Sequence, residues 1–152
     1  LYLNLREREP LGIVRPGAHA EAVLAKLQEG LSALRDPATG EPVVRTLYRG
    51  SELYAGPRAA EAADLAVGFQ PGYRVSWQTA LGGTPATVLE PNRKKWCGDH
   101  CSLDPAVTPG VLFSNRPIES ATARIEDIAP TVLRRLGIAP PADMDGRDLG
   151  LR

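Results

Sequence analysis

The sequence has few aromatic residues, no net charge and no long apolar run. Phe, Trp and Tyr make up 5% of its 152 residues, which argues against a stacking platform for single-stranded nucleic acid. Basic and acidic residues number 18 each, so no broad electrostatic attraction to nucleic acid or anionic lipid is expected. No run of about 18 apolar residues occurs, so no membrane-spanning helix is predicted. The expected partners therefore include neither a nucleic acid polymer nor a membrane.

Cysteine and methionine are also scarce. Two cysteines are too few for a disulfide scaffold. Since no secretory leader is visible either, the cytoplasm is the expected compartment. The single methionine is Met144, and the chain opens on the alternating apolar residues 1–5. This pattern is typical of a strand entered partway, so we expect a piece of a larger polypeptide.

Apolar periodicity predicts both strands and helices. Two helices are expected over 18–34 and 125–136, the second ending at Gly137. The charged residues 6–9 are expected to be solvated. A short, mostly buried strand of the α/β type is expected over 64–69. Further extended segments are expected over residues 1–5, 12–14, 43–48, 73–77 and 110–114. This alternation of strands and helices predicts an α/β layer structure.

The candidate chemistry lies in residues 82–104, which have no periodicity and predict a long loop. Within this loop His100 is a candidate ligand for zinc or a related divalent metal. Cys97 and Cys101 flank it, which raises the alternative of a small structural zinc domain built on Cys97, His100 and Cys101. Such a site usually needs four ligands, so two partly buried thiols are favoured, and a disulfide depends on geometry.

Several stretches in one order carry a family resemblance. They are Gly98-Asp99-His100, Pro109 to Phe113, Ile125 to Leu133, Leu136-Gly137-Ile138 and Asp143 to Arg147. This series resembles the C-terminal end of the alkaline phosphatase superfamily. It is most similar to the type I phosphodiesterase and nucleotide pyrophosphatase branch, and more distantly to sulfatases and cofactor-independent phosphoglycerate mutases. The opening residues 2–14 are similar to the middle of bacterial members.

The resemblance implies a fold and a chemistry. The implied fold is the C-terminal portion of a three-layer α/β/α structure, with a mixed sheet and flanking helices. Residues 1–152 would form a single or partial domain, and 7–96 would include part of a cap. Members of this family hold two divalent metal ions, zinc or manganese, and attack a phosphate ester with a Thr or Ser nucleophile.

The resemblance also assigns roles to individual residues. The position of His100 is a metal ligand in the family, whereas Asp99 occupies a variable place. The segment from Asp127 to Thr131 has a structural role there. Asp127 is expected to cap the last helix, with Pro130 in its first turn, so Thr131 is not the nucleophile.

The family's nucleophile and most of its metal ligands precede the matched segment. We therefore expect this chain to contribute one metal-ligand histidine, to be inactive by itself, and to self-associate through exposed edges. The alternative is a noncatalytic α/β binding or interaction module. The choice among phosphomonoesters, phosphodiesters, nucleotide pyrophosphates and sulfate esters stays open at this point.

Overall fold

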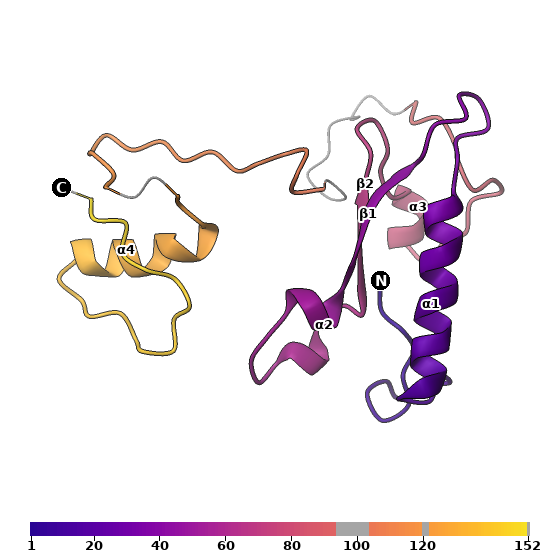
Figure 1. Ribbon diagram of the computed structural model, residues 1–152, viewed down its shortest axis with the longest axis horizontal. Coiled ribbons are helices and arrows are strands. Elements are labelled where there is room, and N and C mark those ends of the chain that lie inside the picture. The colour runs from indigo at the N-terminus through magenta and orange to yellow at the C-terminus, as the bar shows by residue number, and fades with distance from the viewer. Residues whose placement is uncertain (94–103, 120–121, 152) are drawn as a thin grey trace. The chain divides into compact units, whose positions relative to one another are not determined.

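The computed structural model describes residues 1–93, 104–119 and 122–151. Figure 1 shows a mixed α/β chain that divides into two compact units, Leu1–Thr108 and Pro109–Arg152. Each unit is described by itself. In the described ranges, no helix combines the length and apolar character that crossing a bilayer requires. The predicted α/β character is thus confirmed at the level of mixed helices and strands.

The first unit contains helices around one antiparallel strand pair. In chain order its elements are α1 (Ala18–Ala33), β1 (Val44–Arg49), α2 (Gly50–Leu53), a 3-10 turn (Ala59–Glu61), β2 (Leu65–Phe69) and α3 (Trp77–Ala80). The predicted helix over 18–34 and the predicted strands over 43–48 and 64–69 are therefore confirmed to within one or two residues. The extended segment expected over 73–77 forms no regular strand and ends one residue early, because Trp77 already begins α3.

The pairing of β1 with β2 is antiparallel. Thr46 lies opposite Gly68, and Leu47 lies opposite Val67. A parallel pair needs a crossover of a dozen or more residues that spans the sheet. The connection here contains only α2 and the 3-10 turn, which reverse the chain direction beside the strands.

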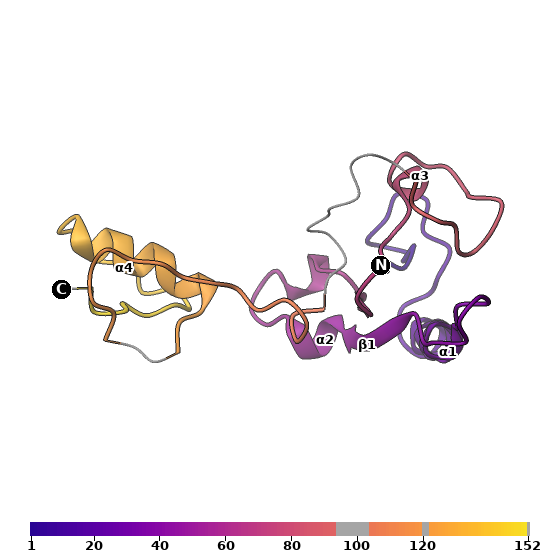
Figure 2. The ribbon, with the colours of Figure 1, turned by 90° about the horizontal axis from the view of Figure 1, so that it is seen from above.

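Helix α1 covers one face of this strand pair, and Figure 2 shows the helix end-on beside β1. Its apolar stripe supplies Ala20 and Leu24 to the core, where they meet Leu3 and Leu65. The guanidinium of Arg49 on β1 also donates hydrogen bonds to Gln28 and Glu21 of α1. Burying the apolar stripe against the sheet stabilises the helix more than its intrinsic propensity does.

The opening residues extend along β2 without forming a regular strand. Leu1 and Leu65 exchange two backbone hydrogen bonds, of 2.8 and 3.2 Å. Leu5 makes only an isolated bridge to Val14, so the predicted strand over 1–5 is not formed. The reason is that the amide of Leu3 donates to the Asp64 carboxylate rather than to a neighbouring strand.

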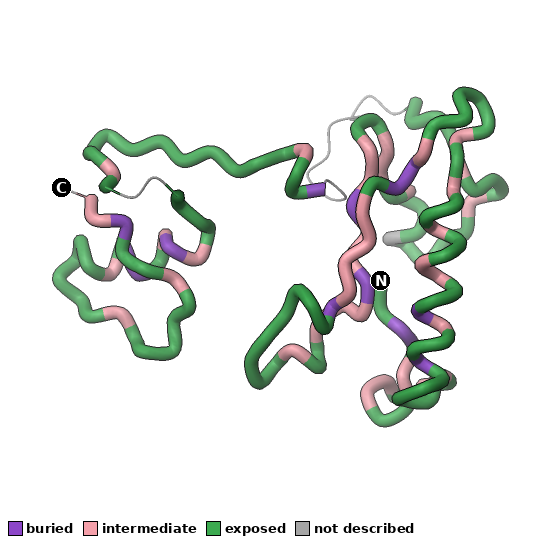
Figure 3. The backbone as a smooth tube through the Cα atoms, in the orientation of Figure 1, coloured by how far each residue is buried: buried purple, intermediate pink, exposed green. Residues whose placement is uncertain are grey.

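The second unit is built around α4 (Ile128–Arg135), which a 3-10 turn (Ile125–Asp127) precedes. Together they confirm the predicted helix over 125–136, and Gly137 ends it with φ of 75°. The predicted buried strand over 110–114 is wrong. Val111 and Phe113 are 82% and 89% exposed, and this stretch has no strand assignment, as the largely exposed tube of Figure 3 illustrates.

Candidate functional site

A buried carboxylate lies on the β1–β2 pair where the described chain resumes after residue 93. Asp104 is fully buried. The hydroxyl of Tyr48 donates a hydrogen bond of 3.1 Å to its Oδ2 atom, and the Thr46 hydroxyl donates another. Nε of Arg45 lies 3.9 Å from Oδ1. Three side chains of β1 therefore hold one carboxylate.

The alternation of β1 explains why these hydroxyls converge. Thr46 and Tyr48 are two positions apart, so their side chains lie on the same face of the strand pair. Gly68 is the cross-strand partner of Thr46 and so belongs to that face. Leu47 points to the opposite face and packs against the core that α1 helps to form. Asp104 and α1 consequently occupy opposite faces of the same two strands.

Gly68 leaves the space that Asp104 fills. A Cβ atom at position 68 would lie 2.3 Å from Oδ2 and 2.9 Å from Cγ of Asp104. Side-chain atoms do not approach that closely in a packed interior. A glycine on β2 is therefore required for the Asp104 carboxylate to reach the hydroxyls of β1.

Asp104 also fixes the turn that follows it. Its Oδ1 atom accepts a hydrogen bond of 2.8 Å from the Ala106 amide. Its carbonyl oxygen accepts bonds from the amides of Val107 and Thr108, at 2.9 and 3.1 Å. Such a side-chain to backbone bond two residues on is typical of an Asx turn. The chain after position 103 thus enters a turn tied to the sheet.

The surroundings of Asp104 favour its ionised form. Burial by itself would raise the pKa of this carboxyl. The Ala106 amide and the hydroxyls of Thr46 and Tyr48 outweigh burial, and with the Arg45 charge they lower its pKa below the usual value. A buried, charged carboxylate with all of these partners in place is held in one position.

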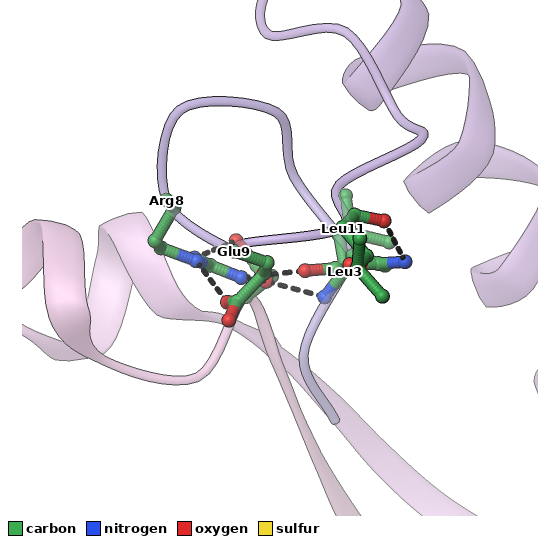
Figure 4. A network of polar contacts seen from close by, with 6 residues as sticks. Leu3, Arg8, Glu9 and Leu11 are labelled. Atoms are coloured by element: carbon green, nitrogen blue, oxygen red, sulfur yellow. Dashed lines mark hydrogen bonds and ion pairs between the residues drawn. The ribbon is translucent and has the colours of Figure 1, made fainter.

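A second carboxylate clamps the N-terminal segment to β2. Arg8 donates to both oxygens of Asp64, at 3.1 and 2.8 Å, and to the carbonyl of Leu3. Figure 4 shows the Arg8 guanidinium directed at this cluster, with Glu9 beside it. The solvated charge run predicted over 6–9 is therefore wrong for Arg8, whose side chain is 21% exposed.

The clamp changes the pKa of both partners. Burial would raise the pKa of Asp64, but the hydrogen bonds from Arg8 and from the Leu3 amide lower it overall. The hydrogen bond to Asp64 raises the pKa of Arg8, which is charged in any case.

A cavity of about 820 Å³ lies in the first unit between residues 36–38, 72–78 and 85–93. The Arg74 guanidinium stacks over the Trp77 ring, 4.2 Å from its centre. Glu90, another lining residue, accepts hydrogen bonds from Ser76 and Gln78. The volume is within the range of small-molecule pockets, and the lining mixes apolar surface with a few polar groups.

In the second unit, Asp127 and Thr131 join the start of α4 to the C-terminal residues. Asp127 accepts hydrogen bonds of 2.9 Å from the amides of Arg124 and Arg147. The buried Thr131 hydroxyl donates to the Asp127 carbonyl at 2.6 Å and accepts from the Leu149 amide. The Arg147 and Arg124 amides together outweigh burial and lower the pKa of Asp127.

These contacts settle two structural expectations. Asp127 occupies the position before α4, and Pro130 lies in its first turn, as predicted. The Asp127 side chain, however, does not cap α4; it bonds the amide of Arg124 at the start of the preceding 3-10 turn. The 3-10 turn begins the helical segment three residues before α4. The backbone amides that lack an acceptor within the helix therefore lie at the start of this turn and not at the start of α4. Among the described residues, the partners of the Thr131 hydroxyl are the backbone groups of Asp127 and Leu149.

The residues that the sequence singles out for metal binding lie outside the described residues. These are His100, Cys97 and Cys101, together with Asp99. Within residues 1–93, 104–119 and 122–151, no three His, Cys, Asp or Glu side chains gather to hold a metal ion. His19, the other histidine, accepts a hydrogen bond from the Arg15 amide at an exposed position. The described part of the chain does not by itself form a metal centre.

The sequence patterns did not identify Asp104 and Asp64 as carboxylates that join segments distant in the sequence. One signal for Asp104 was present, because an Asp-Pro pair directly after an aperiodic stretch favours a turn. Another was the two hydroxyl side chains at alternate positions of the predicted strand 43–48. For Asp64 no local signal exists, since Arg8 lies 56 positions away in the chain.

Comparison with known proteins adds no relative. No protein-family model, curated protein or solved structure matches this chain.

Proposed function

We propose that this chain is the C-terminal part of a metal-dependent hydrolase of phosphoric esters. The proposed class is similar to type I phosphodiesterases and nucleotide pyrophosphatases. The observation that carries the proposal is the ordered series of motifs from Gly98 to Arg147. Within this series His100 supplies one ligand to a centre of two divalent ions, zinc or manganese.

One feature of the second unit supports the proposal. The segments 125–133 and 143–147 contribute separate stretches to the resemblance. Asp127 joins them through the Arg147 amide, and Thr131 adds the bond to Leu149 just beyond. Two stretches that carry the resemblance thus form one packed structure, which supports the structural role given to the segment from Asp127 to Thr131. The wider three-layer α/β/α architecture, with part of a cap included in 7–96, belongs to the proposal.

The ligands present do not complete a two-metal centre. A single imidazole holds at most one position on one ion, and the described residues add no ligand cluster. The nucleophile and the other ligands must come from outside this chain. Bound metals would supply charge stabilisation at the phosphoryl oxygens and activation of the nucleophile. The isolated chain is accordingly inactive, and its exposed apolar surface leads to self-association in the cytoplasm of the producing cell.

Substitution of His100 tests the proposal. In the complete polypeptide that carries this chain, His100→Ala lowers the bound metal and the hydrolysis rate of bis(4-nitrophenyl) phosphate together. His19→Ala is the matched control, because it removes the only other histidine at an exposed site. Unchanged metal stoichiometry in His100→Ala contradicts the assignment.

A second assay tests the inactivity of the isolated chain. With zinc or manganese added, the 152-residue chain should not hydrolyse nitrophenyl esters of phosphate. Clear turnover that follows the purified chain through its last column would contradict the need for residues outside it.

The cavity beside Trp77 supports a second candidate function, a noncatalytic α/β binding module. Its volume and its mixed lining suit a small ligand without help from other residues of a larger protein. Under this reading, the isolated chain binds a small molecule and Trp77 fluorescence reports the binding. Trp77→Phe would then abolish the fluorescence change, and His100→Ala would leave both binding and metal content unchanged.

The third possibility, a structural zinc domain on Cys97, His100 and Cys101, predicts unfolding by a chelator.

A further inference from the structure

We infer that the cavity in the first unit binds a small zwitterion, an inference that rests on the second candidate function, the binding module. The ligand is a molecule of dipeptide size with an ammonium group and a carboxylate on an apolar body. Two acidic and two basic side chains line this cavity, namely Asp36, Glu90, Arg74 and Arg93. Charges of both signs therefore line one space.

Uncharged donors hold the two carboxylates of the cavity. Asp36 accepts a hydrogen bond of 2.7 Å from the Tyr73 hydroxyl. Glu90 accepts hydrogen bonds from the Ser76 hydroxyl and the Gln78 side-chain amide, at 3.1 and 3.2 Å. In the described part of the chain, neither carboxylate forms an ion pair with an arginine. The described arginines thus leave both negative charges available to a ligand.

Two contacts fix Arg74 at the cavity. Its guanidinium lies over the Trp77 ring, 4.2 Å from the ring centre, and its Nε–H donates to the Val75 carbonyl at 3.1 Å. A guanidinium is planar, and its N–H groups match the geometry of a carboxylate. Because the stack positions the guanidinium before a ligand arrives, less entropy is lost on binding. Arg74 is therefore the expected partner of the ligand's carboxylate, and Arg93 adds a second positive charge.

The mixed charges of the cavity favour a ligand that carries both signs. A simple anion would meet the two carboxylates, and a simple cation would meet the two guanidiniums; placing like charges together costs affinity. Half-buried Pro85 and Leu89 line the same cavity and offer apolar surface to the body of the ligand. The volume of about 820 Å³ lies in the upper part of the range for sites that take drug-sized molecules, hence the dipeptide size.

Calorimetric titration of the complete polypeptide with three matched probes tests this ligand class. The probes are leucyl-leucine, N-acetyl-leucyl-leucine, which lacks the ammonium group, and leucyl-leucinamide, which lacks the carboxylate. Leucyl-leucine should bind most tightly. Each of the other two should bind about 10–100-fold more weakly, the loss expected for one charged hydrogen-bonded contact.

Variants that remove one charge assign each group of the ligand. Glu90→Gln should weaken binding of leucyl-leucine about 10–100-fold but not that of N-acetyl-leucyl-leucine, which has no ammonium group. Arg74→Gln should weaken binding of leucyl-leucine in the same way but not that of leucyl-leucinamide. Arg93→Gln, at an exposed position, repeats the basic arm if Arg74→Gln does not fold. Glu61→Gln and Arg58→Gln are matched controls, because they break an exposed ion pair outside the cavity, and all three affinities should stay unchanged.

The outcomes separate the zwitterion from the functions proposed above. If all three probes bind equally, or only a singly charged probe binds, the zwitterion is overturned and the binding module stands. If leucyl-leucine does not bind, the zwitterion is overturned, and a Trp77 fluorescence change with another small molecule would still uphold the binding module. If leucyl-leucine binds most tightly and Glu90→Gln and Arg74→Gln each remove the advantage of one charge, the inference is supported. The hydrolase proposal is judged separately, by the metal content of His100→Ala.

Discussion

The Asp104 carboxylate occupies the space that a side chain on residue 68 would need. A Cβ atom on Gly68 would lie 2.3 Å from Oδ2 of Asp104, far inside van der Waals contact. The two residues lie on different segments of the first unit, so the strand pair and the chain after residue 103 constrain each other. A substitution of Gly68 therefore tests whether the Asp104 carboxylate packs against β2.

Gly68→Ala should therefore destabilise the first unit. The added methyl group forces either β2 or Asp104 to move, and overpacking of this kind costs about 1–3 kcal/mol. Gly30→Ala is the matched control, because nothing lies within 4 Å of a Cβ atom there. Alanine in a helix interior should stabilise α1 by about 0.5–1 kcal/mol. Urea unfolding of both variants measures the difference, and equal effects would contradict the close approach.

Acid should weaken the clamp between Arg8 and Asp64. Because the folded-state pKa of Asp64 lies below the usual value of an aspartate, its stabilising contribution is fully present at pH values above that usual pKa. The contribution is lost as the pH falls through the folded-state pKa. The gap in unfolding free energy between wild type and Asp64→Asn should thus be largest near neutral pH and shrink below about pH 4.

Urea titrations at several pH values measure this gap. Glu52→Gln, at an exposed position of α2, serves as the control for removal of one acidic charge. A gap for Asp64→Asn that stays constant down to strongly acidic pH would show that the clamp does not depend on the ionised carboxylate.

Thr131→Val should loosen the second unit without changing side-chain shape. The valine keeps the size of threonine but removes the hydroxyl that bonds the Asp127 carbonyl and the Leu149 amide. Both groups would remain buried without that partner, at a cost of about 1–3 kcal/mol. Hydrogen exchange at the Leu149 amide should accelerate in this variant. Thr84→Val, at an exposed position, should change neither stability nor exchange; slow exchange at Leu149 in Thr131→Val would contradict the role of the hydroxyl.

Two exposed apolar residues at the C-terminal end of α4 should cause self-association of the chain. Val132 and Leu136 are 50% and 68% exposed and lie one helical turn apart. Replacing both with glutamine removes a shared apolar stripe, so the monomer fraction in analytical ultracentrifugation should rise. Leu11→Gln controls for the loss of one isolated exposed leucine. A wild-type chain that sediments as a monomer at every concentration would contradict the prediction.

Local patterns predicted the local elements, and long-range contacts explain the failures. The apolar stripe of α1 and the end of α4 at Gly137 both depend on residues that are close together in the sequence. Both helices were therefore predicted correctly. The direction of β2 depends on its connection to β1, which composition does not encode. Residues 110–114 are apolar enough for a strand, yet a strand also needs a partner to accept its hydrogen bonds.

The candidate site shows the same division. The sequence singled out His100 by its residue type and its aperiodic surroundings, which stays a prediction, and the family resemblance implied a structural role for the Asp127 segment. It could not reveal Asp104 as an anchor, because Tyr48 lies 56 positions earlier and the space for the carboxylate depends on Gly68 across the strand pair. Paired groups that are distant in sequence carry no periodicity of their own.

The pairing of Leu1 with Leu65 also determines the order in which the first unit can be completed during synthesis. Helix α1 needs only its own neighbours to begin forming. The opening residues, by contrast, leave the ribosome 64 positions before the strand residue that receives them. In the same way, Arg8 can bind Asp64 only after the later residue has been synthesised. The same holds for Tyr48 and Asp104. Closing such long loops precedes any gain from the contacts, so α1 can begin to form before the strand pair closes but gains its packing stabilisation only afterwards.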